Sequence, residues 1–128
     1  MTNPEVAGDR AQAHSAAGDT VAGDVVAVTM FSLLPGVDAN EFLRFSTDLD
    51  QPTCRAFGDV VRSFEVYRVD VAPDGAPADV LEVMHVADWA AWEQIRDHHP
   101  AFRPVMHEFT RLVDLTSIRT WFAQPVRR

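Results

Sequence analysis

The spacing of hydrophobic residues changes along the chain between a period of two and a period of three to four. Alternation with a period of two is typical of strands, and the longer period is typical of amphipathic helices. On this basis strands are predicted over residues 25–34, 60–69, 79–86 and 116–122. The first of these has apolar residues on both alternating faces, which indicates that both of its faces are covered.

Helical signals occupy the gap between the first two predicted strands. Asp38 is followed three residues later by Glu41, a capping-box pattern for the start of a helix. The apolar residues on one face of this helix are Phe42, Phe45 and Leu49. Because Pro52 disfavours helical geometry in the residue before it, we expect the helix to end near Asp50 or Gln51 and an irregular connection to follow.

A second helical region follows the third predicted strand. Asp88 is a suitable N-cap, and Trp89 and Trp92 begin an apolar stripe that places both indoles in the core. Pro100 interrupts this helix after two histidines and is well placed as the first residue of the next helix. The stripe of that last helix is Phe102, Val105, Met106, Phe109, Leu112 and Val113.

The predicted order is strand, helix, strand, strand, interrupted helix, strand. This is the order of an α+β, ferredoxin-like fold, βαββαβ, with an antiparallel four-stranded sheet and helices on one face only. Because two of the strands are apolar on both faces, the face without helices needs a cover, and the simplest cover is a second copy of the chain. We therefore expect a homodimer in which two sheets pair.

Composition sets the limits of this domain and narrows its partners. Residues 1–23 hold almost no large apolar side chain and predict a flexible leader, residues 24–123 form the expected domain, and residues 124–128 a polar tail. The net charge of −8 argues against a nucleic-acid partner, and no apolar run approaches the ~18 residues of a membrane span. The single cysteine, Cys54, is typical of a cytoplasmic protein and is expected to be a buried filler rather than a nucleophile.

Three segments of the chain resemble a known family. They are DLDQPTCRAFGDVVRSFEVYRV, with the patterns D-x-x-T and V-x-S-F-x-V-x-R, then VLEVMHVADWAAWE, and the spaced aromatics of PAFRPVMHEF. Together they are similar to the dimeric α+β barrel proteins, and more narrowly to the RedY/HapK-like branch encoded beside prodiginine and bisindole pathways. The resemblance covers residues 25–122. It implies an enzyme of secondary metabolism that works without a cofactor, or a protein that binds and steers a reactive aromatic intermediate.

The hairpin between the second and third strands gives the sharpest prediction of a site. If it is centred on Gly75, Glu65 lies opposite His85 and Arg68 lies opposite Glu82. A carboxylate beside a histidine orients the ring and favours its action as a general base near neutral pH. A shift of the strand register by one residue would separate both pairs.

The sequence leaves two interpretations open for each of these candidates. His85 is either a catalytic or ligand-binding residue, or a core or interface histidine, and Tyr67 near Glu65 is a candidate hydroxyl donor. Glu82 is either half of a structural ion pair or a buried acid. His99 either caps the junction between the two helices or points into a pocket.

The remaining candidates concern substrate, metal and cofactor. The aromatic residues of the last two helices, Trp92 and Phe102 among them, are either core or the walls of a pocket for an aromatic substrate, with Tyr67 and Arg68 as further substrate contacts. The sequence has no phosphate-cradling glycine loop, serine nucleophile motif or metal triad. We therefore expect no metal and no cofactor.

Two hypotheses from different functional classes follow. The first is a cofactor-independent enzyme of natural-product biosynthesis that acts on a reactive pyrrole, bisindole or polyketide-like aromatic intermediate by acid–base catalysis of cyclisation, tautomerisation or decarboxylation. In it, His85 oriented by Glu65 is the residue whose loss reduces activity most. The second is a non-catalytic, chaperone-like protein that binds the small-molecule aromatic intermediate and hands it on.

Overall fold

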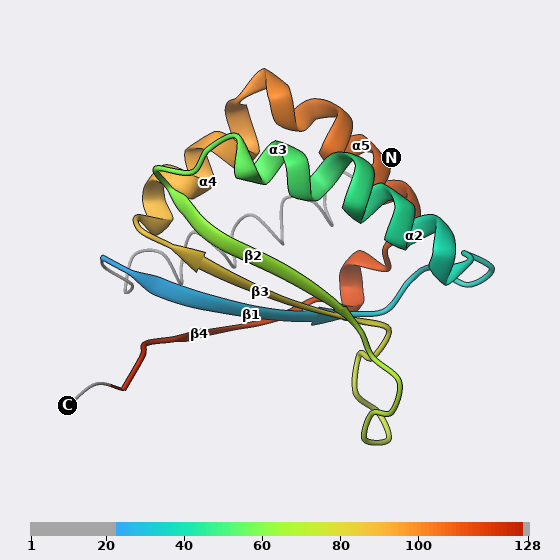
Figure 1. The fold of residues 1–128 in the computed structure, drawn as a ribbon. Helices are drawn as coiled ribbons and strands as arrows, with labels where there is room; N and C mark the ends of the chain where they lie inside the picture. Colours follow the sequence, from blue (N-terminus) through green and yellow to red (C-terminus); the bar gives the residue numbers. More distant parts are fainter. Residues whose placement is uncertain (1–22, 127–128) are drawn as a thin grey trace.

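The computed structural model describes residues 23–126, so the predicted leader, apart from Gly23, and the last two residues of the polar tail lie outside it. Figure 1 shows one twisted sheet with helices α2, α3, α4 and α5 on the same face. The strands are β1 (Val25–Phe31), β2 (Val61–Arg68), β3 (Val80–Val86) and β4 (Arg119–Ala123). The helical segments are α2 (Ala39–Phe45), η1 (Ser46–Asp50), α3 (Gln51–Arg55), α4 (Trp89–His98), η2 (Pro100–Phe102), α5 (Arg103–Leu112) and η3 (Leu115–Ser117).

The sheet confirms the predicted ferredoxin-like fold. Its strand order is β2-β3-β1-β4, and each neighbouring pair is antiparallel. The two strands with apolar side chains on both faces, β1 and β3, are the central strands of this sheet. β4 begins later than predicted because Asp114 accepts a hydrogen bond from the backbone N–H of Thr116 and caps the short helix η3 there.

The predicted cross-strand register between β2 and β3 is wrong by two residues. His85 lies opposite Ser63 rather than Glu65, and Glu82 lies opposite Val66 rather than Arg68. The backbone bonds of the loop show where the hairpin is centred: the N–H of residue 76 bonds to the carbonyl of residue 73, and the N–H of Val69 bonds to the carbonyl of Asp79, so the centre lies before Gly75. A shift of two keeps the side chains of residues 63–68 on their predicted faces, whereas a β-bulge between Val61 and Ser63 turns Val61 into the core.

The first helix does not stop before Pro52, as the sequence predicts, but continues to Arg55. The π-helical turn η1 makes this continuation feasible, because the N–H of Gln51 bonds to the carbonyl of Ser46, five residues earlier. Pro52 thereby falls in the first turn of α3, where a backbone N–H is not required. The first part of the segment expected to be irregular, Gln51–Arg55, is therefore helical and carries Cys54 on its buried face, and only residues 56–60 form turns.

The hydrophobic core fills the space between the sheet and the helices. β1 contributes Val25, Ala27 and Phe31, and the two predicted indoles, Trp89 and Trp92, are buried there as expected. The opposite face of the sheet is bare in Figure 1. Strand alternation assigns to this open face the side chains of Val26, Val28, Met30, Ser63, Glu65, Tyr67, Leu81, Val83, His85, Arg119, Trp121 and Ala123.

Candidate functional site

A pocket of about 610 Å³, open solvent at its mouth included, lies between the sheet and the helices. Its lining is mostly apolar and aromatic, with a few polar side chains, which is the usual composition of a small-molecule site. The lining residues are Ala27, Thr29, Asp50, Cys54, Phe64, Glu82, Met84, Trp89, Trp92, Arg96, Phe102, Val105, Met106 and Phe109.

Glu82 is the acidic group that the sheet contributes to this pocket. It stands in the middle of the central strand β3, opposite Thr29 of β1 and Val66 of β2. Both neighbouring strands pair with β3 here, so the backbone of Glu82 is held on both sides. A side chain on such a position keeps its geometry better than one on a loop.

Asp50 and Cys54 enter the pocket from the first helix, one turn apart. Cys54 donates a long hydrogen bond, 3.6 Å, from its Sγ to Oδ1 of Asp50, and both residues are buried. Burial is the main cause that raises the pKa of the Cys54 thiol far above its usual range, and the negative charges of Asp50 and then Glu82 add to it. The carboxyl groups of Asp50 and Glu82 are therefore both close enough to Cys54 to raise the pKa of its thiol.

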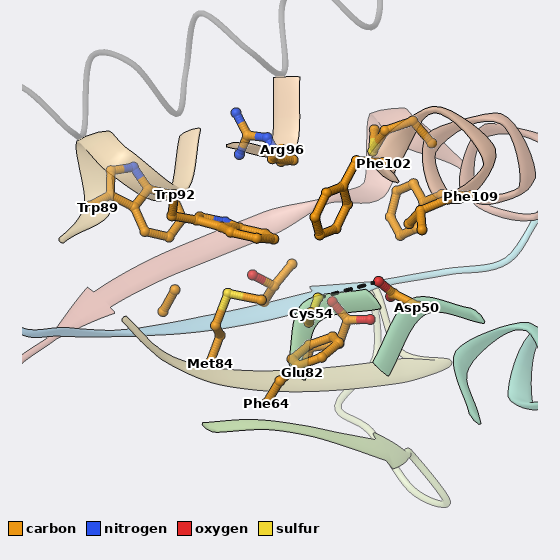
Figure 2. Close-up of a pocket in the computed structure, with 14 residues that line it drawn as sticks. Asp50, Cys54, Phe64, Glu82, Met84, Trp89, Trp92, Arg96, Phe102 and Phe109 are labelled. Carbon is orange, nitrogen blue, oxygen red and sulfur yellow. Dashed lines mark hydrogen bonds between the residues drawn. The ribbon is translucent and has the colours of Figure 1, made fainter. Parts of the chain in front are cut away.

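Aromatic rings face these polar groups across the pocket. Figure 2 shows Trp92, Phe102 and Phe109 on one side of the pocket, and Glu82 of β3 gathered with Cys54 and Asp50 of the first helix on the other. Trp92 and Phe102 meet edge to face with ring centroids 5.2 Å apart, which fixes both rings.

Arg96 of α4 forms part of the rim of the pocket. Only 6% of it is exposed, and it donates two hydrogen bonds to the carboxylate of Asp97, one from Nε (2.7 Å) and one from Nη2 (3.0 Å). Glu93 Oε2 lies 3.9 Å from the same Nη2. The guanidinium is therefore held by acidic groups of its own helix, on the opposite side of the pocket from Glu82 (Figure 2).

The structure separates the sequence-predicted candidates into two groups. Glu82, Trp92 and Phe102 line the pocket together. His85 and Glu65 lie instead on the open face of the sheet, and the predicted pair does not form. His85 Nε2 lies 4.0 Å from Oδ2 of Asp24.

Tyr67, Arg68 and His99 also lie outside this pocket. Tyr67 is on the open face, where the charge of Glu65, then burial and a hydrogen bond to Glu65, raise its pKa. Arg68 bonds to Asp70 at 3.3 Å rather than to Glu82. His99 caps the turn that places Phe102, because its Nδ1 accepts the N–H of residue 101 at 3.0 Å.

Two charged residues of the pocket, Asp50 and Arg96, were not among the predicted site residues. Asp50 is the aspartate of the D-x-x-T pattern, so the motif carried a signal for it, but the predicted helix end at Pro52 concealed its inward direction. Arg96 falls on the apolar stripe that Trp89 and Trp92 begin, and a charged residue on such a stripe is a sign of a polar site.

The described part of the chain contains neither a cluster of metal-ligating side chains nor a membrane-spanning helix. Within residues 23–126 there is no group of three or more His, Cys, Asp and Glu side chains arranged to hold a metal ion. None of the helices in this range has the length and apolar character needed to cross a bilayer.

A family model described as HapK, a REDY-like protein, matches residues 25–126 of this chain. The crystal structure of HapK from Hahella chejuensis is similar in fold, with a TM-score of 0.62, 19% identity, and coverage of 81% of this chain and 96% of that one. No curated protein matches the chain.

Two further solved structures share the fold. A DABB family protein with a ferredoxin-like fold from Mesorhizobium loti has a TM-score of 0.60 at 22% identity, covering 82% of this chain and 99% of that one. A dimeric protein of unknown function from Bacteroides fragilis, also ferredoxin-like, has a TM-score of 0.55 at 15% identity, covering 80% and 96%. At these identities the likeness concerns the fold alone.

Proposed function

The chain belongs to the family of REDY-like HapK proteins, and from this premise we propose that it is a cofactor-independent enzyme of natural-product biosynthesis. Its substrate is a reactive aromatic intermediate of the pyrrole, bisindole or polyketide-like class. The reaction is acid–base catalysis of a cyclisation, tautomerisation or decarboxylation. We place the enzyme in the cytoplasm, where its single free cysteine stays reduced.

The observation that carries this proposal is the position of Asp50 and Glu82 in a pocket whose other walls are aromatic. Two carboxyl groups, one protonated and one ionised, can donate a proton to a substrate and remove another in the same site. A tautomerisation needs only those two transfers. A cyclisation removes a proton from the attacking atom and adds one to the carbonyl oxygen, and a decarboxylation adds one to the carbon that has lost CO₂.

Cys54 acts in this scheme as a positioning residue. Its raised pKa keeps the thiol protonated, so that it holds Asp50 through the S–H···O hydrogen bond and does not attack the substrate. The rings of Trp92 and Phe102 bind the flat substrate and exclude water, which strengthens the effect of the carboxyl groups.

Reconstitution of the pathway step with purified protein separates the enzyme from a carrier. We expect a protein-to-substrate ratio far below one to change the product over many turnovers. An Asp50→Asn/Glu82→Gln double variant that folds normally should lose this effect. If the effect of the wild-type protein saturates at one equivalent and the double variant retains it, the chaperone-like alternative holds and the acid–base proposal fails.

We also propose that the enzyme is a homodimer joined through the open face of the sheet. Tyr67 and Trp121 are 47% and 53% exposed on this face, and Val26, Val28 and Val83 lie between their strands. Apolar surface of this extent on a sheet is typical of an interface. The dimeric Bacteroides fragilis protein, which has the same fold, supports this assignment.

A further inference from the structure

A second hollow lies on the outer side of the aromatic wall and shares three residues with the inner pocket. The shared residues are Arg96, Phe102 and Met106. The outer hollow encloses about 520 Å³, open solvent included, and its other lining residues are Asp97, His98, His99 and Arg103. The two hollows therefore adjoin at these three residues.

The outer hollow has one more basic than acidic side chain, although the chain as a whole carries a net charge of −8. Its lining has two arginines against one acid, Asp97, and two histidines add further hydrogen-bonding groups. Both oxygens of Asp97 already accept hydrogen bonds from Arg96. Arg103 is exposed, and no acidic group within residues 23–126 forms an ion pair with it. The guanidinium of Arg103 is therefore available to an anion.

His99 adds a donor of fixed position to this hollow. Its Nδ1 accepts the backbone N–H of Ala101, so the neutral imidazole carries its proton on Nε2 and donates from there. The C-terminal end of α4 brings partial negative charge to the hollow, but Arg96 and His98 lie in its last turn. The N-terminal end of α5 also adjoins the hollow and brings partial positive charge. The local charge remains favourable to an anion.

We propose that this outer pocket binds a carboxylate carried by the ligand, while the aromatic ring of the same ligand occupies the inner pocket. The inference rests on the proposed function only in its assumption that the inner pocket takes an aromatic ring. A monoanionic carboxylate suits the site, because Arg96 is committed to Asp97 and the donors that remain are those of Arg103 and the histidines. The substrate class narrows to aromatic acids.

Indole-3-acetate and indole-3-acetamide are suitable probes, because they share the ring and the arm length and differ in charge. Calorimetric titration of the full chain should give the acetate about tenfold higher affinity than the acetamide. In Arg103→Gln this preference should disappear while the affinity for the acetamide stays unchanged, and Arg103→Lys should restore part of it. Arg44→Gln, which removes one exposed arginine of α2 outside both pockets, is the matched control and should keep the full preference.

The outcomes distinguish this inference from the proposed function. If both probes bind equally to the wild-type protein, or if Arg103→Gln keeps the preference, the carboxylate subsite is refuted and the aromatic pocket stands. If neither probe binds at millimolar concentration, the subsite and the aromatic pocket are both refuted. Added salt should reduce the preference, since the Arg103 contact is partly exposed to solvent.

Discussion

Cys54 Sγ and Asp50 Oδ1 lie 3.6 Å apart on the buried side of one helix, facing the same pocket. The π-helical turn that ends at Asp50 sets the direction of both side chains. Burial, together with the charges of Asp50 and Glu82, raises the pKa of the thiol, so that it stays protonated near neutral pH. The buried thiol is therefore a poor nucleophile, which leaves the carboxyl groups as the proposed reactive groups of this pocket.

The first prediction concerns the reactivity of Cys54. Because the thiolate is the reactive form and the thiol is buried, folded protein should not react with iodoacetamide at about pH 8, whereas unfolding in guanidinium should allow rapid reaction. Intact-mass spectrometry measures the adduct. An Ala90→Cys variant, with the new thiol on the exposed side of α4, should gain one adduct while folded. Alkylation of the folded wild-type protein at a comparable rate would contradict the buried thiol.

The second prediction concerns stability in alkali. The folded pKa of Cys54 lies above the unfolded one, near 9.0, so above that pH the unfolded chain releases a proton that the folded chain keeps. The free energy of unfolding should then fall with rising pH, by up to about 1.4 kcal/mol per unit. Chemical unfolding between about pH 9 and pH 10.5 measures this slope.

The composition of the chain makes that slope simple to assign. The chain has one cysteine and one tyrosine, and all of its eleven Lys and Arg residues are arginines, so few groups titrate in this range. Cys54→Ala should remove most of the slope. Tyr67→Phe should keep most of it, because the raised pKa of the exposed Tyr67 adds to the slope only as the pH approaches the ordinary tyrosine value of 10.0. A slope that survives undiminished in Cys54→Ala would assign the alkaline loss of stability to another group.

The fold could be predicted because its signals are local. The hydrophobic periods, the Asp88 cap of α4 and the break at Pro100 each depend on a few neighbouring residues, and the structure confirms them. The end of the first helix could not be predicted in this way. A proline disfavours helical geometry in the residue before it, and this rule holds within a regular α-helix. Here the extra residue of the π-helical turn lets the helix continue past Pro52. No residue type identifies such a turn from the sequence.

The site was harder to predict because it depends on the strand register and on which face the helices cover. The hairpin is centred one residue earlier than predicted, which shifts the pairing of the strands by two residues. Glu65 is therefore not opposite His85, although both lie on the same face of the sheet. Since β3 is apolar on both faces, its sequence gives no sign of which face carries the pocket. The sequence favoured His85 over Glu82, and only the placement of the helices shows that Glu82 is the one that lines the pocket.

The third prediction compares these two residues. Glu82→Gln removes a proton-transferring group from the pocket, so turnover in the reconstituted step should fall about 100-fold or more, as is typical of general acid–base catalysis. His85→Gln changes the open face and should keep turnover within about threefold of wild type if the dimer persists. Thermal melting of both variants controls for folding. Loss of turnover in His85→Gln alone would move the catalytic group to the open face.

The last prediction tests the dimer at the centre of the open face. Val28 of β1 lies between Val83 of β3 and Trp121 of β4, so in the proposed interface its side chain is surrounded by apolar residues of both copies. Light scattering should give the wild-type protein twice the chain mass of 14.2 kDa at micromolar concentration. Val28→Arg would bury an unpaired charge there, costing about 3 kcal/mol or more and raising the dissociation constant about 100-fold.

Val71→Arg makes the same replacement in the β2–β3 loop, at a residue that is 90% exposed, and should leave the dimer intact. Because the open face of a single copy would tolerate an arginine, a folded Val28→Arg monomer is the expected product. A wild-type monomer, or a Val28→Arg dimer as tight as wild type, would show that the open face is not the interface.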